Sequence, residues 1–339
     1  MTRRRLALFA VAARDDGRLR SVVAWSCLAV VASPLVTGCG ARSELPIPNA
    51  PYVVLFPISA GVENDAVLAR VTQTFSLWHS RTKTISTVGT YASELATMSF
   101  DGRFIAVNHC AAGSCAGEPG VALDVLAPDG AIVWSQPEAE WLGALRPDGQ
   151  RVLVGVPLAN TSSTTEFSLC VLDRGSTPVP IRTESQNDYL IEPSYARDGE
   201  TIVAVQVNSS QVPAALVTMR DDGTRYTTLD VDGGAFYAPS FDFDGTAIVY
   251  TVLRPMGFQD VAVVDVASHE SRIVYSGTQF SWNMGRFTPD GLAIVIQELD
   301  ETSVETLRHI DLATGEASIL WQGHASSYSY PEFAVAADD

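Results

Sequence analysis

The stretch P-S-F-D-F-D-G-T-A-I-V-Y-T-V at residues 239–252 is the clearest of five related copies in the chain. Each copy reads as a short apolar strand, an Asp-Gly turn and a second strand rich in β-branched residues. Gly takes a positive φ without steric cost and Asp tolerates the neighbouring conformation, so the pair favours a tight hairpin. Runs such as A-I-V-Y are too short and too β-branched for a helix. The other copies lie at residues 98–107, 145–154, 193–205 and 287–296.

The Asp-Gly turns recur at a nearly constant spacing. Successive turn aspartates are separated by 47, 50, 46 and 46 residues. A period in this range is typical of β-propeller blades, each built of about four strands. A second hairpin follows each copy, for example at residues 121–134, and supplies the other two strands. The residues to which we assign a structural role in the turns are Asp101, Gly102, Asp148, Gly149, Asp198, Gly199, Asp244, Gly245, Asp290 and Gly291.

The number of periods predicts the number of blades. Residues 51–339 hold about six periods, of which five are contiguous, near 91–136, 141–184, 189–232, 236–277 and 280–322. A lone strand begins at residue 51, and residues 330–339 read as an innermost strand that stops at its turn. We therefore expect an all-β, six-bladed propeller of four-stranded antiparallel blades, with one blade shared by residues 51–88 and 330–339. Such a closure leaves no exposed sheet edge.

The repeat also carries a family resemblance. The pattern P-x-[FWY]-S-x-D-G resembles the WD40-like (PD40) repeat of TolB-type β-propellers, over most of the chain after residue 50. The resemblance implies a propeller fold and a binding role in the cell envelope. It implies no particular reaction, because propellers host many unrelated activities. That family has an extra α/β domain before its propeller, and we expect none in the segment before residue 51.

The charge of the chain excludes some partners. The net charge is −17, and beyond Gly38 the chain holds 16 basic and 37 acidic residues, a net −21. This balance disfavours nucleic acid, because phosphate binding needs clustered cations. It also disfavours docking to anionic lipid by surface charge. A solvated acidic surface is the simplest interpretation, and a face for cations or a basic partner is the alternative.

The N-terminal segment is typical of an exported lipoprotein. Residues 1–38 contain a basic region, then an uncharged apolar core and small residues, as in a secretory signal peptide. The sequence L-V-T-G-C that ends at Cys39 resembles the bacterial lipobox, which implies a lipidated Cys39 and membrane attachment. Residues 39–50 read as a short tether. In bacterial lipoproteins an Asp after the lipidated cysteine tends to retain the protein at the inner membrane. This chain has Gly40 at that position, which favours the outer membrane. The alternatives are an uncleaved anchor at residues 21–41 and a twin-arginine signal at Arg3-Arg4.

Three other cysteines fit an exported protein. Cys110 and Cys115 bracket a short loop, and a disulfide between them would suit an oxidising envelope. A metal site at His109 and Cys110 would need further ligands that the sequence does not supply nearby. Cys170 lies in the apolar run S-L-C-V-L, and we expect a buried small hydrophobe rather than a nucleophile.

An aromatic residue precedes each predicted innermost strand. These candidate binding residues are Tyr91, Trp141, Tyr189, Tyr237, Trp282 and Tyr330. If they gather at one mouth of the central channel, they would grip a peptide, a glycan or a small ligand. The alternative is that they wedge neighbouring blades together. Glu94, Glu192 and Glu332 lie near the same mouth and would add an acidic lining.

No motif in the sequence names a reaction. The turn aspartates recur in every blade, whereas a catalytic carboxylate pair is unique. Residues 230–233 and 242–245 hint at calcium loops but lack the closing glutamate. The sequence has no G-x-S-x-G, phosphate loop or H-E-x-x-H. We therefore predict no cofactor and no metal.

Two main functions remain. The first is a monomeric, lipid-anchored envelope scaffold that binds a protein, peptide or glycan. The second is a propeller enzyme, a lyase or hydrolase of extracellular polymers, with its site in the central channel. A purely structural envelope component is a third possibility.

Overall fold

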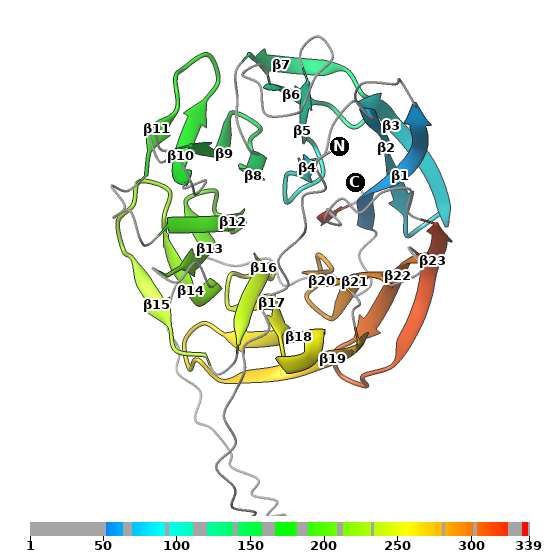
Figure 1. The fold of residues 1–339 in the computed structure, drawn as a ribbon, viewed down its shortest axis with the longest axis vertical. Coiled ribbons are helices and arrows are strands. Elements are labelled where there is room, and N and C mark those ends of the chain that lie inside the picture. The colour runs from blue at the N-terminus through cyan, green and yellow to red at the C-terminus, as the bar shows by residue number, and fades with distance from the viewer. Residues whose placement is uncertain are drawn as a thin grey trace, which may run out of the picture. The chain divides into compact units, whose positions relative to one another are not determined.

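Six four-stranded antiparallel sheets stand in a ring and form a six-bladed β-propeller (Figure 1). The computed structural model describes residues 52–63, 70–91, 95–110, 121–137, 142–157, 167–181, 189–208, 213–231, 234–279, 282–300, 304–324 and 334–337. The fold predicted from the repeat is confirmed. The only helix among the described residues is the 3-10 turn η1 (Pro255–Gly257).

The blades are numbered here along the chain, and in each the first strand given is the innermost. Blade 1 comprises β4 (Leu95–Met98), β5 (Ile105–Cys110), β6 (Val121–Leu126) and β7 (Ile132–Gln136). Blade 2 comprises β8 (Leu142–Leu145), β9 (Arg151–Pro157), β10 (Phe167–Asp173) and β11 (Val179–Pro180). Blade 3 comprises β12 (Tyr189–Tyr195), β13 (Thr201–Val207), β14 (Pro213–Arg220) and β15 (Thr227–Leu229). Blade 4 comprises β16 (Ala235–Phe241), β17 (Ala247–Leu253), β18 (Phe258–Asp265) and β19 (Ser271–Gln279). Blade 5 comprises β20 (Trp282–Phe287), β21 (Ala293–Leu299), β22 (Val304–Asp311) and β23 (Ala317–His324).

Blade 6 is assembled from both ends of the propeller. It comprises β24 (Ala334–Ala337), β1 (Tyr52–Glu63), β2 (Arg70–His79) and β3 (Thr84–Tyr91). Strand β24 runs antiparallel to β1, with Tyr52 opposite Ala337 and Leu55 opposite Ala334. The predicted closure is therefore confirmed. Without β24, the inner edge of β1 would present unpaired backbone groups to the channel.

The five Asp-Gly hairpins share one backbone geometry. In each, the glycine N–H donates to the carbonyl three residues earlier, as from Gly102 to Ser99 at 2.9 Å. The five glycines all have φ between 67° and 73°. The preceding aspartate does not share this left-handed conformation. Its carboxylate instead accepts a backbone N–H beyond the glycine, as Asp148 does from Gln150 at 3.0 Å.

The fourth turn departs from this pattern. The carboxylate that accepts the backbone N–H groups belongs to Asp242, from Thr246 at 2.8 Å and Ala247 at 3.1 Å. Asp244, the aspartate that the sequence repeat selects, is exposed. Two aspartates in D-F-D-G compete for one role, and the first of them lies at the position that reaches both N–H groups.

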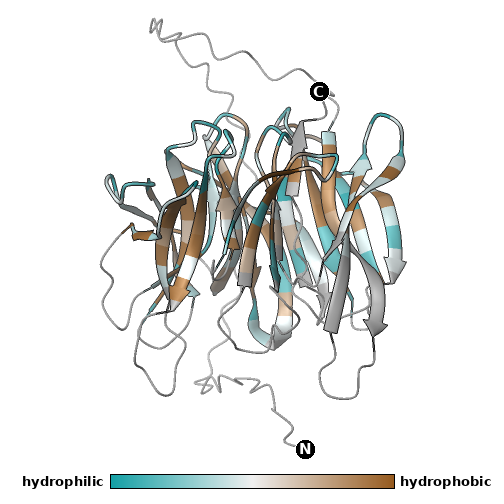
Figure 2. Ribbon diagram, turned by 90° about the horizontal axis from the view of Figure 1, so that it is seen from above, coloured by the Kyte–Doolittle hydropathy of each residue, from teal (hydrophilic) through white to brown (hydrophobic). Residues whose placement is uncertain are grey.

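The core lies between neighbouring blades, where the apolar faces of the sheets meet. In Figure 2 apolar residues run through the strands, while the turns at their ends are hydrophilic. Between blades 4 and 5, Val249 and Val261 pack with Ile294 and Ile296. Gly285 makes this contact close, because a Cβ there would lie 2.8 Å from both valines.

Several predicted features lie outside the described residues. These are the signal peptide at 1–38, the tether at 39–50, Cys39, Cys115, Trp141, Tyr330, Glu94 and Glu332. The backbone of Cys110 ends β5, but its side chain is not described. Cys170 is buried, and its thiol donates to the carbonyl of Ser168 at 3.5 Å. None of the described residues belongs to a helix with the length and apolarity that a membrane span requires.

Candidate functional site

The innermost strands of blades 3 and 4 carry matching irregularities in the wall of the central channel. Glu192 and Ala238 both have left-handed backbones, with φ of 50° and 49°, and each precedes a proline. The pairing of β12 with β13 and of β16 with β17 shifts at these positions, which marks a β-bulge in each strand. A left-handed conformation costs a non-glycine residue of order 1–3 kcal/mol and is concentrated at functional sites. Bulges re-aim side chains in the same places.

The two bulges are joined across the blades. The Glu192 carboxylate on blade 3 accepts the N–H of Ala238 on blade 4. From blade 5, Nη1 of Arg286 donates to the carbonyl of Ala238 at 3.0 Å and to its neighbour Gly285 at 2.9 Å. The Glu192 carboxylate, the backbone N–H and C=O of Ala238 and the Arg286 guanidinium therefore form a chain through three successive blades, which we call the channel wall.

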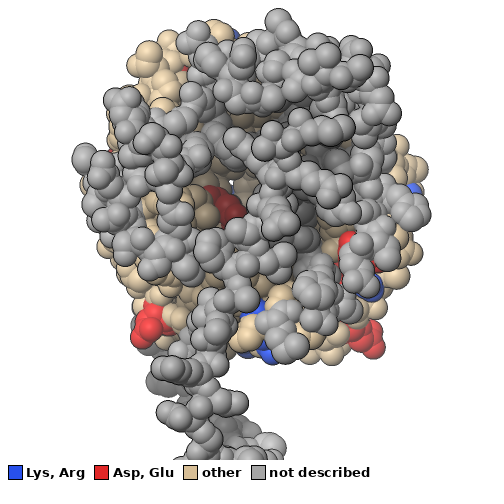
Figure 3. Space-filling view, in the orientation of Figure 1, with Lys and Arg blue, Asp and Glu red and all other residues tan. Residues whose placement is uncertain are grey.

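The environment of Glu192 perturbs its protonation. Burial raises the pKa of its carboxyl group, while the Ala238 hydrogen bond and the Arg286 charge oppose the rise. The side chain is nevertheless exposed to solvent. A raised pKa and an exposed residue agree if the Glu192 carboxyl group lines a narrow channel. There solvent reaches the group although protein atoms surround it. A space-filling view shows a hollow near the middle of one face, with acidic atoms inside it (Figure 3).

The predicted aromatic residues that the structure describes do not all lie at one level of the innermost strands. Tyr189 and Trp282 pair with Val207 and Leu299, at the start of the innermost strands of blades 3 and 5. Tyr237 pairs with Thr251, two positions further along β16.

Tyr91 lies elsewhere, at the end of the outer strand β3, opposite Gln73. Tyr91 lies ten residues before Asp101, whereas Tyr237 lies seven residues before Asp244, so the two aromatic residues do not occupy equivalent positions. Of the six aromatic side chains, the structure describes those of Tyr189 and Tyr237, which are half-buried.

Three Asp-Gly turns converge where the innermost strands end. We call this end of the channel the turn end. The rings of Phe100 and Phe243 lie 5.7 Å apart, centroid to centroid. The Arg197 guanidinium lies 3.7 Å from the centre of the Phe243 ring. All three residues stand directly before the aspartate of the D-G pair. Their counterparts in blades 2 and 5 are Pro147 and Pro289.

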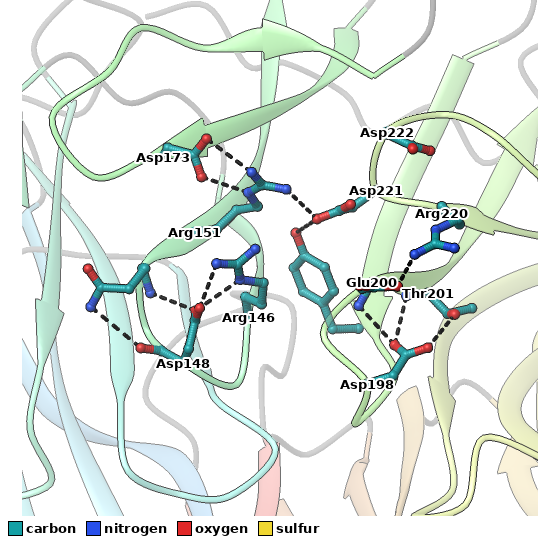
Figure 4. Close-up of polar contacts among 12 residues, drawn as sticks. Arg146, Asp148, Arg151, Asp173, Asp198, Glu200, Thr201, Arg220, Asp221 and Asp222 are labelled. Atoms are coloured by element: carbon teal, nitrogen blue, oxygen red, sulfur yellow. Dashed lines mark hydrogen bonds and ion pairs between the residues drawn. The ribbon is translucent and has the colours of Figure 1, made fainter. Parts of the chain in front are cut away.

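A polar network ties blades 2 and 3 together near their turns (Figure 4). Nε of Arg151 lies 2.6 Å from Oδ1 of Asp173 on its own blade, and Nη1 lies 2.6 Å from Oδ2 of Asp221 on the next. The Tyr195 hydroxyl donates to the same Asp221 oxygen at 3.4 Å. The pairing raises the pKa of Arg151 further above its ordinary value. Because every charge here has a partner, the network is structural.

A different acid, Glu305, is buried where blade 5 faces blade 6. Glu305 is 3% exposed, and it accepts a hydrogen bond from Nε2 of Gln297 at 2.6 Å. Burial raises the pKa of this carboxyl group to about 7, although the Gln297 hydrogen bond opposes the rise. Its position on β22 places it on the same face as Leu307, which packs against Val54 and Phe56 of blade 6.

Solved structures share this architecture. TolB from Acinetobacter baumannii matches with a TM-score of 0.59 and 15% identity over 84% of this chain and 66% of that one. The putative TolB from Agrobacterium tumefaciens matches with a TM-score of 0.55 and 16% identity, over 86% and 99% of the two chains. The fold is that of a TolB-like propeller. The propeller also matches a chain of a nidogen/laminin complex, with a TM-score of 0.56 and 11% identity over 84% and 98%.

At these identities the likeness establishes the fold of the TolB-like propeller and nothing about its activity. The chain spans just under two thirds of the length of the Acinetobacter protein. No protein-family model matches the sequence, and no curated protein matches it.

The channel wall offers hydrogen-bonding groups. Among the described residues, no group of three or more His, Cys, Asp or Glu side chains is placed to hold an ion. A carboxylate held by a backbone N–H and faced by an arginine is a fixed acceptor for an N–H or O–H donor. The sequence predicts Glu192 as a lining residue. It does not predict Arg286, Phe100 or Phe243, although a phenylalanine at the turn position where blades 2 and 5 have proline is a visible signal.

Proposed function

We propose that this TolB-like propeller is a non-catalytic binding scaffold of the cell envelope, attached to a membrane through lipid on Cys39. The observation that carries the proposal is the channel wall. Glu192, Ala238 and Arg286 come from three blades, and two of them hold left-handed backbones. Backbone strain of this kind persists where surrounding structure fixes it, and it preorganises polar groups for a ligand.

The fold neighbours support a protein as the partner. One of them was solved in a complex between nidogen and laminin. Propellers present a ring of loops around a channel, and such a surface suits a peptide segment or a folded domain. The lipobox-like sequence at Cys39 supports the location, with the outer membrane favoured by Gly40.

Site-directed photocrosslinking in intact envelopes tests the proposal. A benzophenone amino acid replaces Tyr189, which begins the innermost strand of blade 3. The matched control carries the same group at Ile132, which is 63% exposed on the outer strand of blade 1. We expect a discrete adduct from position 189 that the control does not give. Equal or absent adducts at both positions would reject the channel mouth as the binding surface.

An enzyme is the second candidate, and one observation favours it. A carboxyl group with a raised pKa in a channel is a property of a general acid. Glycoside chemistry would need a second carboxyl group within roughly 5–10 Å. In the described part of the chain, the group placed next to Glu192 is the guanidinium of Arg286. Loss of polymer cleavage by the purified protein on Glu192→Gln substitution would establish this candidate over the scaffold.

A further inference from the structure

Phe100 and Phe243 belong to turns on opposite sides of the ring. Phe100 lies in the turn between β4 and β5 of blade 1, and Phe243 lies in the turn between β16 and β17 of blade 4. Blades 1 and 4 are separated by two blades in either direction around the ring. Two rings 5.7 Å apart at this separation must meet across the central axis.

The contact is reinforced from a third blade. The Arg197 guanidinium stacks on Phe243 at 3.7 Å, a geometry in which a cation is attracted to the face of the ring. Both phenylalanines are half-buried, although each is the second residue of a surface turn where proline or a polar residue is usual. Burial at a turn tip requires a neighbour, and each ring provides it for the other.

We propose that Phe100 and Phe243 form an aromatic bar that closes the turn end, so that the channel is a pocket with one entrance. Ligands enter from the face where the innermost strands begin. This inference rests on the proposed function, because it concerns access to the same channel wall. Glu192 precedes Arg197 by five residues, so its backbone lies within about 17 Å of the backbone of Arg197, whose guanidinium contacts the bar.

A pocket with one entrance selects ligands by shape. A chain end or a short molecule can reach Glu192, and its leading N–H or O–H group meets the carboxylate. A continuous polymer cannot pass through the ring. The partner class is therefore a ligand that presents an end, such as a peptide terminus, rather than an internal stretch of a long chain.

Two linear polyethylene glycols of equal length test the bar. One carries a thiol-reactive disulfide at its end and the other carries it at its midpoint. The target is Glu192→Cys in the full-length protein, with modification read at that peptide by mass spectrometry. A reactive group at the midpoint must enter a closed pocket as a folded-back loop. Folding the polymer back costs conformational entropy, and two polymer strands must pass the entrance together, so we expect the midpoint reagent to react about tenfold more slowly.

Removal of the two aromatic rings should abolish the difference in reaction rate between the two polymers. In a Phe100→Ala/Phe243→Ala background the polymer can thread, and the two rates should approach each other. The matched control is Pro147→Ala/Pro289→Ala, which alters the same turn position in blades 2 and 5 and should keep the difference. Equal rates with the bar intact, or a ratio that the double alanine variant leaves unchanged, would overturn the proposal.

The bar and the proposed function can fail separately. A double-mutant cycle reports the bar alone: the shift in denaturation midpoint for Phe100→Ala/Phe243→Ala should differ from the sum of the single shifts. Additive shifts would mean that the rings do not touch in solution. Buried Cys170 should stay unmodified in every variant, which verifies folding. The photocrosslinking at Tyr189 reports binding whether or not the bar exists.

Discussion

Nη1 of Arg151 on blade 2 lies 2.6 Å from Oδ2 of Asp221 on blade 3, and this ion pair joins two blades that share no strand pairing. Asp221 is 8% exposed, so its carboxylate depends on Arg151 and on the Tyr195 hydroxyl for compensation. A propeller has few covalent or hydrogen-bonded links between blades, and its cohesion comes from such contacts and from apolar packing.

The first prediction concerns this pair. Arg151→Met leaves Asp221 buried without its cation, and we expect a loss of about 2–3 kcal/mol in the free energy of unfolding. Arg103→Met is the control, because the Arg103 side chain is 62% exposed beside Asp101 and its loss should cost less than about 0.5 kcal/mol. Urea denaturation followed by circular dichroism measures both. Equal effects would show that the link between the blades contributes nothing.

The second prediction concerns pH. Burial raises the pKa of Glu305 to about 7 in the folded protein, above the ordinary value of 4.5. Between these values the folded state binds more protons than the unfolded state, so the contribution of Glu305 to stability falls as pH rises from about 4.5 to about 7. Above that range the buried charge costs up to about 3 kcal/mol.

Glu305→Gln tests the sign. The amide carries no charge, so the variant should be more stable than the parent at pH 8 and close to it at pH 4.5, in matched denaturation curves. Exposed Glu316 on the same blade provides the control, and Glu316→Gln should change stability by less than about 0.5 kcal/mol at either pH. A Glu305→Gln variant that is less stable at pH 8 would contradict the burial argument.

The third prediction concerns ring closure. Deletion of residues 334–339 removes β24 and exposes the edge of β1 at Tyr52–Leu55. It also removes Val335 from the cluster that contains Val54 and Phe56. We expect the midpoint of thermal unfolding to fall by more than about 5 °C. Deletion of residues 338–339 alone leaves the strand and should leave the midpoint near that of the parent. Coincident melting of the two truncated proteins would count against the shared blade.

The fourth prediction concerns membrane attachment. Cys39→Ala removes the proposed lipid site, and the protein should move from the membrane fraction to the soluble fraction of lysed cells. Cys39→Ser gives a second variant with a different side chain and the same expected result. Detection of a lipid-modified N-terminal peptide by mass spectrometry in the parent protein is the positive measurement. Membrane retention of both variants would exclude this anchor.

The ring of blades was predictable because a turn needs the same residues wherever it occurs. Five glycines hold the same left-handed backbone, and each can be read from the D-G pair alone. The apolar strands beside them fix the register, because one face of each must be buried. Closure was also readable, since strand-like segments without partners remained at both ends of the repeat.

The site was harder to predict, because its contacts join blades. Glu192 meets Ala238, and Phe100 meets Phe243, only after the ring has formed. Tyr189 lies nine residues before Asp198, whereas Tyr237 lies seven residues before Asp244, and the matching bulges preserve this offset, so that Tyr237 lies two positions away from the level of Tyr189. An aromatic residue whose distance to the turn varies between blades does not mark one structural position.

The pairing of β1 with β24 sets an order of events in the life of the molecule. Strand β1 emerges early during synthesis, yet its inner neighbour is made only when residue 337 has been added. Until then blade 6 lacks its innermost strand, and the ring of six blades is incomplete. The strand that closes the ring is therefore the last strand of the propeller to be synthesised, and the closed ring forms only after it is available.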